Sequence, residues 1–232
     1  MFVRALLLTL FGSLLAARAW AIDAGIDYTE LASPQATDTG EKIEVLEVFM
    51  YSCPHCFHLE PTIDKWLKTK PDNVEFRRMP AVFGAKVEPH ARAFYAAELM
   101  GVEHKYSAAA FDALHVKKQS IWDEDALVEL AEAQGIDGAE FRKAYNSFFV
   151  GMKVNRAKEM VTRYGIDGVP AIVVNGKYRT SPSQTGSRDK MVLVVDYLIG
   201  VESGTEVVEE IAPAPSTTAV PAAPAAGASG GS

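Results

Sequence analysis

Hydrophobic positions along the chain follow two different periods, and the order of these periods predicts the fold. Residues 42–51 form a nearly continuous apolar run, which is typical of a strand covered on both faces. After a short turn, apolar side chains recur at helical spacing through residue 69, at Cys56, Leu59 and Ile63. Residues 74–79 again have the composition of a strand. This strand–helix–strand order predicts a parallel, right-handed βαβ unit.

The middle of the chain shows the helical period alone. Helices are expected to begin near Pro89, Lys105, Asp123, Asp137 and Phe149. Aspartate at a helix start and glycine after a helix end are the usual capping residues. Aromatic side chains recur at helical spacing in this block, which favours a packed core over a ligand-binding surface. These aromatic residues are Phe94, Tyr95, Phe111, Phe141, Tyr145, Phe148 and Phe149.

Strands return near the end of the folded part. Residues 171–174 and 177–180 are predicted strands, and the Asn175-Gly176 pair between them is typical of a type I′ hairpin turn. Ser187 is the predicted cap of a last helix, which is expected to stop at Gly200. The chain therefore ends its folded part with two strands and a helix.

The order of these elements predicts an α/β fold with a single sheet. Residues 22–84 and 151–202 are expected to form the sheet domain. Residues 85–150 are expected to form an all-helical domain, inserted between the two halves of the sheet and holding a core of its own.

Both ends of the chain differ from this folded part. Arg4, an apolar run at residues 5–17 and an Ala-Trp-Ala sequence ending at Ala21 predict a cleaved signal peptide at residues 1–21. The apolar run is shorter than the roughly 20 residues that span a bilayer. Residues 203–232 are rich in Ala and Pro and are expected to be a disordered tail. The predicted location is outside the cytosol, where disulfides persist.

Composition and charge exclude several classes of partner. The chain carries 30 acidic side chains against 23 Lys and Arg, a formal net charge of −7. A basic footprint for nucleic acid is therefore absent, and polybasic attraction to anionic lipid is not expected. Only two cysteines are present, which excludes a small domain held together by several disulfides.

The two cysteines stand together in the sequence Cys53-Pro54-His55-Cys56, which is compatible with several kinds of site. A structural disulfide closing so short a loop contributes only about 2 kcal/mol in the chain-entropy model. Covalent haem attachment needs a histidine after the second cysteine, but Phe57 stands there. A structural zinc site needs about four ligands, of which only two are cysteines here, so no metal is expected.

A redox pair agrees better with the position of the motif, between a predicted strand and a predicted helix. Unpaired N–H groups and the partial positive charge of a helix start favour a thiolate over a thiol. Cys53 precedes the helix and is the predicted attacked sulfur, while Cys56 lies in its first turn and is the predicted resolving thiol. His55 is expected to lower the pKa of Cys53 further. Pro54 suits the first helical position, where its missing N–H has no partner.

The direction of exchange follows from this preference. A stabilised thiolate stabilises the reduced protein, so the disulfide form passes its oxidising equivalents to other proteins. Two alternatives remain open from the residues: a disulfide isomerase or reductase, and a peptide-binding chaperone in which the motif is incidental. Isomerases of this kind usually carry an N-terminal dimerisation domain, whereas about 20 residues separate the predicted cleavage site from the first strand. That length favours a monomer.

The Cys-Pro-His-Cys motif, the signal peptide and Val169-Pro170 before a hairpin together resemble the DsbA family of disulfide oxidoreductases. The resemblance covers roughly residues 40–200 and implies a thioredoxin fold with a helical insertion. It implies a periplasmic oxidase of reduced, unfolded secreted proteins, reoxidised by a quinone-linked inner-membrane partner, without a cofactor. It also implies a cis peptide bond at Pro170 that leaves the backbone of Val169 free to pair with an extended substrate.

One charged residue stands out inside the first predicted strand. Glu47 shares a face with Ile43 and Val45, where an ionised carboxylate needs a partner or a raised pKa. The family resemblance places an acidic residue below the cysteines, with a lysine from the next strand nearby. Arg78 occupies that place here, or Arg77 if the register differs. Since arginine keeps its proton, a salt bridge that tunes the thiolate is expected and proton transfer by the pair is not.

Overall fold

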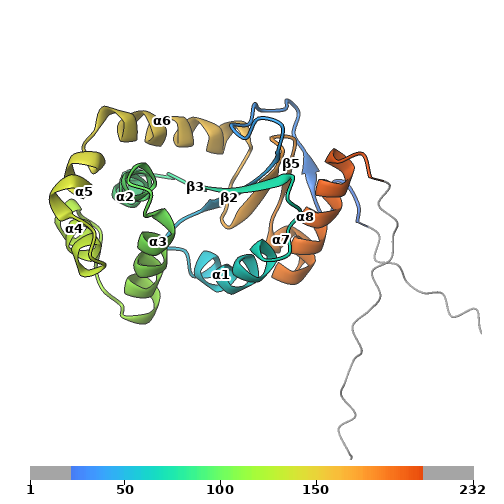
Figure 1. Ribbon diagram of the computed structural model, residues 1–232. Coiled ribbons are helices and arrows are strands. Elements are labelled where there is room, and N and C mark those ends of the chain that lie inside the picture. The colour runs from blue at the N-terminus through green and yellow to red at the C-terminus, as the bar shows by residue number, and fades with distance from the viewer. Residues whose placement is uncertain (1–21, 206–232) are drawn as a thin grey trace, which may run out of the picture. The chain divides into compact units, whose positions relative to one another are not determined.

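A five-stranded sheet is the centre of the fold. The computed structural model describes residues 22–205, and the predicted signal peptide and nearly all of the predicted tail lie outside the described residues (Figure 1). The strands are β1 (Thr29–Glu30), β2 (Ile43–Phe49), β3 (Val74–Pro80), β4 (Ala171–Val174) and β5 (Tyr178–Thr180). Their order is β1-β5-β4-β2-β3, and β2 pairs parallel to β3 and antiparallel to β4. The predicted parallel βαβ unit is confirmed.

Helices connect and cover these strands. They are α1 (Pro54–Leu67), α2 (Glu88–Leu99), α3 (Glu103–Phe111), α4 (Glu124–Ala133), α5 (Gly138–Tyr145), α6 (Phe148–Arg163), α7 (Pro182–Thr185) and α8 (Arg188–Glu202), with a short 3₁₀ turn η1 (Ala85–Val87) and a π-helical turn η2 (Asp112–Val116). The helix predicted from Lys105 is thus divided between α3 and η2. Asp123, Asp137 and Ser187 cap α4, α5 and α8 through their side chains, as expected.

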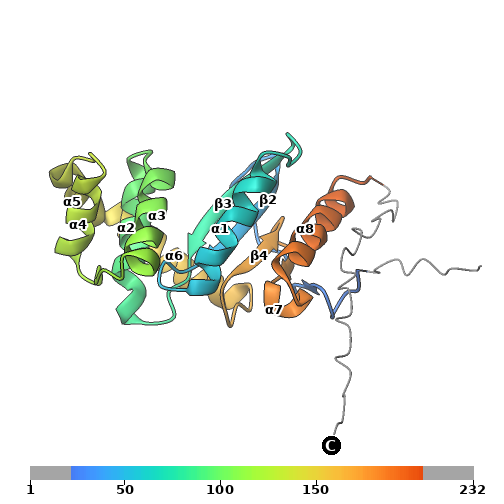
Figure 2. The same ribbon diagram turned by 90° about the horizontal axis from the view of Figure 1, so that it is seen from below.

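Two apolar layers hold the sheet. Helices α1 and α8 lie on one face, whereas α6 runs along the other (Figures 1 and 2). Alternation along β2 explains this: Ile43 and Val45 join a cluster with α1 and α8, while Leu46 and Val48 face the opposite side. Every residue of β2 is buried, Glu44 and Glu47 included, which accounts for its mostly apolar sequence.

The helical block α2–α5 continues the second of these clusters. Leu46 and Val48 of the sheet belong to the same buried cluster as Phe94, Phe111 and Phe141 of the block. The block therefore shares its core with one face of the sheet, contrary to the expectation of a separate core. The expected boundary between residues 150 and 151 falls inside α6.

Two of the seven aromatic residues assigned to this core lie at the surface instead. Phe148 and Phe149 are 76% and 65% exposed at the start of α6. The other five are buried, as predicted. Helical spacing identifies side chains that share a face of a helix, but it does not show whether another element covers that face.

The last hairpin agrees with the sequence-based prediction, whereas the end of the last helix differs from it. Asn175 and Gly176 both have positive φ, at 49° and 63°, as the type I′ turn requires. A Cβ atom at Gly176 would also overlap the carbonyl oxygen of Gln35. The prediction that α8 stops at Gly200 is wrong, because the helix continues to Glu202 and the chain turns at Gly204, with φ 64°. Within residues 22–205, none of the helices has the length and apolar character of a membrane span.

Candidate active site

The Cys53-Pro54-His55-Cys56 motif forms the junction between β2 and α1. Cys53 is the residue before the helix, in an extended conformation, and Pro54 is the first helical residue. The Cys53 N–H donates to the carbonyl of Met50 at 3.1 Å, and the Phe57 N–H donates to the carbonyl of Cys53 at 3.1 Å. Proline fits this position because its fixed φ suits the helix and no N–H partner is lost.

The two sulfurs differ in access, as the sequence predicts. Both cysteines are free thiols; Cys53 is 9% exposed and Cys56 is fully buried. The Cys53 Sγ lies 3.4 Å from the carbonyl oxygen of Val169, and the peptide bond between Val169 and Pro170 is cis. The cis-proline loop therefore stands directly against the more accessible sulfur.

The surroundings of Cys53 stabilise its thiolate. The pKa of Cys53 lies at about 6, below the usual range, chiefly because the Cys56 thiol donates a hydrogen bond to its sulfur. Burial acts in the opposite direction, while the backbone N–H groups of Cys56 and His55 and the charge of His55 lower the pKa further. His55 itself is exposed.

Cys56 has the opposite preference. Burial raises the pKa of its thiol far above the usual range, and its hydrogen bond to Cys53 and the negative charges of Cys53 and Glu47 act in the same direction. Cys56 therefore stays protonated when Cys53 ionises, and it can keep donating its hydrogen bond. The site holds one thiolate and one thiol at neutral pH.

A pH titration of the reduced protein tests this arrangement. The thiolate absorbance of Cys53 is expected to appear with a midpoint near pH 6 rather than near the ordinary cysteine value of about 8.5. Since the pKa is lowered on folding, the thiolate stabilises the reduced fold above the ordinary pKa, and this stabilisation is lost as the pH falls through about 6. Cys53→Ser provides the blank and should remove the transition. A midpoint at the ordinary value contradicts the arrangement.

A buried ion pair lies below the cysteines. Glu47 is fully buried and faces Arg78 across the β2–β3 ladder; the Arg78 Nε donates to the Glu47 Oε2 at 2.9 Å. The pairing partner is therefore Arg78 rather than Arg77. The Glu47 Oε1 has no hydrogen-bond partner among the described residues. Burial raises the pKa of Glu47, and the positive charge of Arg78 opposes that rise.

Two further carboxylates meet the same arginine, and the sequence analysis missed both. Glu60 of α1 accepts from the Arg78 Nη2 at 2.8 and 2.9 Å, and the Glu103 Oε1 lies 3.7 Å from the Arg78 Nη1. Burial raises the pKa of Glu60 to about 7. Glu60 lies one helical turn after Cys56, on a helix whose apolar face is buried. The four-residue spacing from Cys56 is the only feature of the sequence that indicates the position of Glu60. No feature of the sequence indicates that Glu103 lies near the site.

A groove runs from the active-site turn along the cis-proline loop. It has a volume of about 890 Å³, and its lining includes His55, Val169, Pro170 and the segments 181–184 and 186–189. The described residues hold no cluster of three or more metal-ligating side chains.

Comparison with known proteins places this geometry in a family. The model of the DSBA-like thioredoxin domain matches residues 44–192, which include the motif, the helical block and the cis-proline loop. The chain belongs to the DsbA family. It is accordingly a thiol:disulfide oxidoreductase, and the predicted thioredoxin fold with a helical insertion is confirmed.

Named DsbA relatives cover most of this DsbA-family chain. The thiol:disulfide interchange protein DsbA of Burkholderia cepacia is 39% identical over 76% of this chain and 84% of the relative. The protein of that name from Pseudomonas aeruginosa is 39% identical over 84% and 91%. The crystal structure of Pseudomonas aeruginosa DsbA superposes with a TM-score of 0.75, at 38% identity, over 79% of this chain and 95% of that structure.

Proposed function

We propose that this DsbA-family protein is a periplasmic oxidase that donates the Cys53–Cys56 disulfide to folding secreted proteins. The observation that carries the proposal is the placement of Cys53 directly before the first turn of α1, beside the buried Cys56 thiol, which lowers the pKa of Cys53. A stabilised thiolate makes Cys53 a good leaving group and makes the reduced protein the more stable form. Both properties favour oxidation of other thiols over their reduction.

The exchange proceeds in two steps. A substrate thiolate attacks the Cys53 sulfur, the bond between the cysteines breaks, and Cys56 leaves with the electron pair and takes up a proton. A second substrate thiolate then attacks the substrate sulfur of the mixed disulfide and releases Cys53 as a thiolate. The substrate loses two electrons and the protein gains two. Cys53 is 9% exposed and Cys56 is fully buried, and this difference supports the assignment of attacked sulfur and resolving thiol.

Residues around the cysteines take supporting roles in this proposal. Pro54 and His55 shape the turn and its charge, and the backbone of Val169 with Pro170 binds an extended substrate segment by strand addition. The 3.4 Å contact between the Cys53 sulfur and the Val169 carbonyl supports that role. Glu47 is proposed to tune the pair through Cys56, whose pKa its charge raises, with Arg78 as its counter-ion.

The proposal extends to the partners and the location, and membership of the DsbA family supports it. The substrates are reduced, unfolded secreted proteins in the periplasm, which the chain reaches through the signal peptide proposed at residues 1–21. A quinone-linked protein of the inner membrane accepts the two electrons and restores the Cys53–Cys56 disulfide. No cofactor is needed on the chain itself, since the redox centre is the pair of sulfurs.

Equilibration with glutathione tests the oxidase assignment. The protein is expected to stand mostly reduced in redox buffers that leave an ordinary structural disulfide oxidised, and the reduced form is expected to unfold at a higher denaturant concentration than the oxidised form. The fraction reduced is measured by alkylation of free thiols, and unfolding by circular dichroism. If the oxidised form is the more stable one, the protein is a reductase and the proposal is wrong.

A further inference from the structure

A histidine of the helical block contacts the active-site turn. His115 lies in η2, and its Nε2 is 2.7 Å from the backbone carbonyl oxygen of Tyr51, two residues before Cys53. Because a carbonyl oxygen only accepts, the Nε2 atom carries the proton and donates. The bond joins the helical block to the segment between the end of β2 and the first sulfur.

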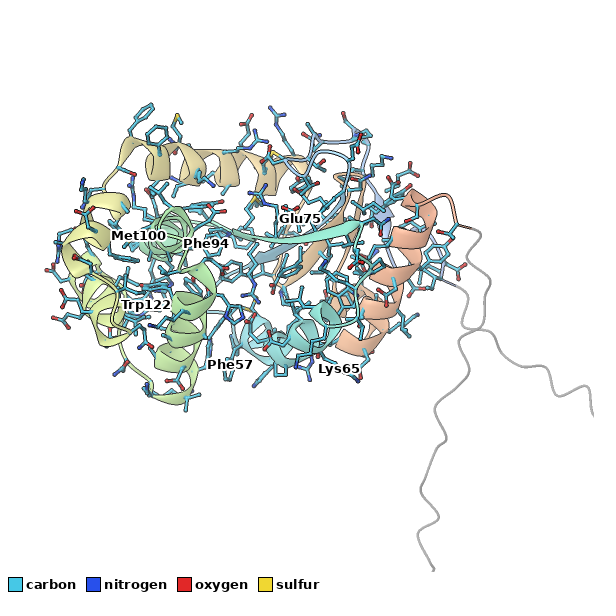
Figure 3. The ribbon with its side chains drawn as sticks, in the orientation of Figure 1. Phe57, Lys65, Glu75, Phe94, Met100 and Trp122 are labelled. Carbon is cyan, nitrogen blue, oxygen red and sulfur yellow. The ribbon has the colours of Figure 1, made fainter. Side chains whose placement is uncertain are left out.

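The same imidazole also contacts the other side of the motif. Its ring stacks on Phe57 with a centroid distance of 4.9 Å and an interplanar angle of 13°. Phe57 directly follows Cys56 in the first turn of α1, and Figure 3 shows it between α1 and the helical block. His115 therefore contacts the chain both before Cys53 and after Cys56.

Tyr51 is held at a second point by the same block. Its phenol forms a 2.7 Å hydrogen bond with the Ser107 hydroxyl, and that hydroxyl donates to the Glu103 Oε1 at 2.8 Å. Tyr51 and Ser107 are both buried. Ser107 of α3 holds the side chain of Tyr51, and His115 holds its carbonyl, so Tyr51 has little freedom to move. Tyr51 therefore sets the direction in which the chain enters the Cys53 turn.

The chemistry of Cys53 depends on that direction. Its sulfur is stabilised by the Cys56 thiol and by the N–H groups of His55 and Cys56, and hydrogen bonds weaken steeply when their distances and angles change. In the oxidised protein the disulfide itself fixes the two sulfurs. In the reduced protein only non-covalent contacts hold the turn, so a contact that fixes the turn stabilises the reduced form more than the oxidised form.

We propose that His115 is a positioning residue for disulfide exchange, through which the helical block holds the active-site turn in the geometry that favours the reduced form. The proposal rests on the oxidase function proposed above. The π-helical turn η2 supports it: the Lys117 N–H donates to the Asp112 carbonyl at 2.9 Å, and such turns inside helices are frequent at functional sites.

The variant His115→Phe distinguishes the effect of the hydrogen bond to Tyr51 from that of the stacking on Phe57. Phenylalanine keeps a ring against Phe57 but has no donor for the Tyr51 carbonyl. The equilibrium constant for reduction of the protein disulfide by glutathione is expected to fall by about three- to tenfold, in line with the loss of one hydrogen bond. The midpoint of the Cys53 thiolate titration should rise in parallel. His115→Gln keeps a donor within reach and is expected to restore most of both values.

His90→Phe is a matched control. The His90 Nε2 is 2.8 Å from the carbonyl of Ile121, and its ring stacks on Trp122 at 4.6 Å, much as His115 bonds a carbonyl and stacks on Phe57. The His90 ring also lies edge-on to the Tyr51 ring at 6.1 Å, a contact that phenylalanine keeps, but neither ring nitrogen of His90 bonds to the backbone of the turn. The variant His90→Phe should lower the denaturant midpoint of unfolding and leave the equilibrium constant with glutathione unchanged. If His115→Phe lowers the unfolding midpoint and leaves the equilibrium and the titration at wild-type values, the proposal is wrong.

These outcomes are distinct from a failure of the oxidase assignment. That assignment depends on the wild-type equilibrium with glutathione, whereas the positioning role depends on the difference between His115→Phe and the wild type. A wild-type protein that behaves as a reductase would overturn the first. An unchanged equilibrium in His115→Phe would overturn the second.

Discussion

Replacing Cys53 with serine is expected to abolish disulfide transfer completely. A serine hydroxyl can neither form a disulfide nor ionise near neutral pH, and the remaining thiol of Cys56 is fully buried. A substrate thiolate therefore finds no sulfur to attack. The measurement is the rate at which a reduced test protein gains its native disulfides in the presence of the oxidised protein. Full activity of Cys53→Ser would exclude the oxidase mechanism.

Cys56→Ser provides the matched control and fails in a different way. Its Cys53 thiolate attacks oxidised glutathione or a substrate disulfide, forms a mixed disulfide with one half and releases the other half as a thiol. No second thiol of the protein is present to resolve that bond, so the mixed disulfide should accumulate and be visible by mass spectrometry. Accumulation in Cys56→Ser but not in Cys53→Ser identifies Cys53 as the attacked sulfur.

Replacing Arg78 with methionine is expected to produce the largest loss of stability. The change removes the buried partner of Glu47 and the bidentate partner of Glu60, while methionine keeps much of the side-chain volume. Breaking a buried pair by removing one partner costs about 3–5 kcal/mol of unfolding free energy. Chemical denaturation at pH 7 measures the loss. An unchanged denaturant midpoint would show that these carboxylates do not depend on the arginine.

The pH dependence of this variant has a defined sign. A carboxyl group whose pKa is raised on folding binds more protons in the native than in the unfolded state, so stability falls as the pH rises. For Glu60 that fall runs from the ordinary glutamate pKa of about 4 to about 7 in the wild type. Loss of Arg78 should make this fall in stability steeper and extend it to higher pH. Adding Glu47→Gln removes one buried charge and should recover part of the stability.

Arg142→Met is the control for a general effect of losing an arginine. Arg142 also bridges two carboxylates, at 2.8 Å from Glu124 and 2.8 Å from Asp125, but all three lie at the surface. Exposed ion pairs contribute little to stability. The denaturant midpoint of this variant should stay close to that of the wild type.

The sequence predicts those parts of the fold and the site that depend on local chemistry. The mostly apolar run of β2 and the helical period of α1 locate the central strand and helix, and the proline after Cys53 marks their junction. The different burial of Cys53 and Cys56 follows from that junction alone. The cis bond before Pro170 came from the family resemblance, because a trans proline at the start of a strand satisfies the same sequence.

Features that depend on distant contacts could not be predicted in the same way. The strand β1 contains only two residues and pairs with β5 from far along the chain, so it leaves no periodic signal. Glu60 and Glu103 meet Arg78 only after α1, β3 and α3 have packed together. The hydrogen bond from His115 to Tyr51 likewise depends on the π-helical turn, which a helical period does not distinguish from an ordinary helix.

The buried cluster that joins Leu46 and Val48 to Phe94 and Phe111 also constrains what can be done with the inserted segment. Excising the helices between β3 and α6 would leave an apolar surface of the strands open to water. Grafting the same helices onto another scaffold would remove the strand residues that they pack against. The insertion is therefore not a transferable cassette, and chimeras with other oxidoreductases have to exchange the strands and these helices together.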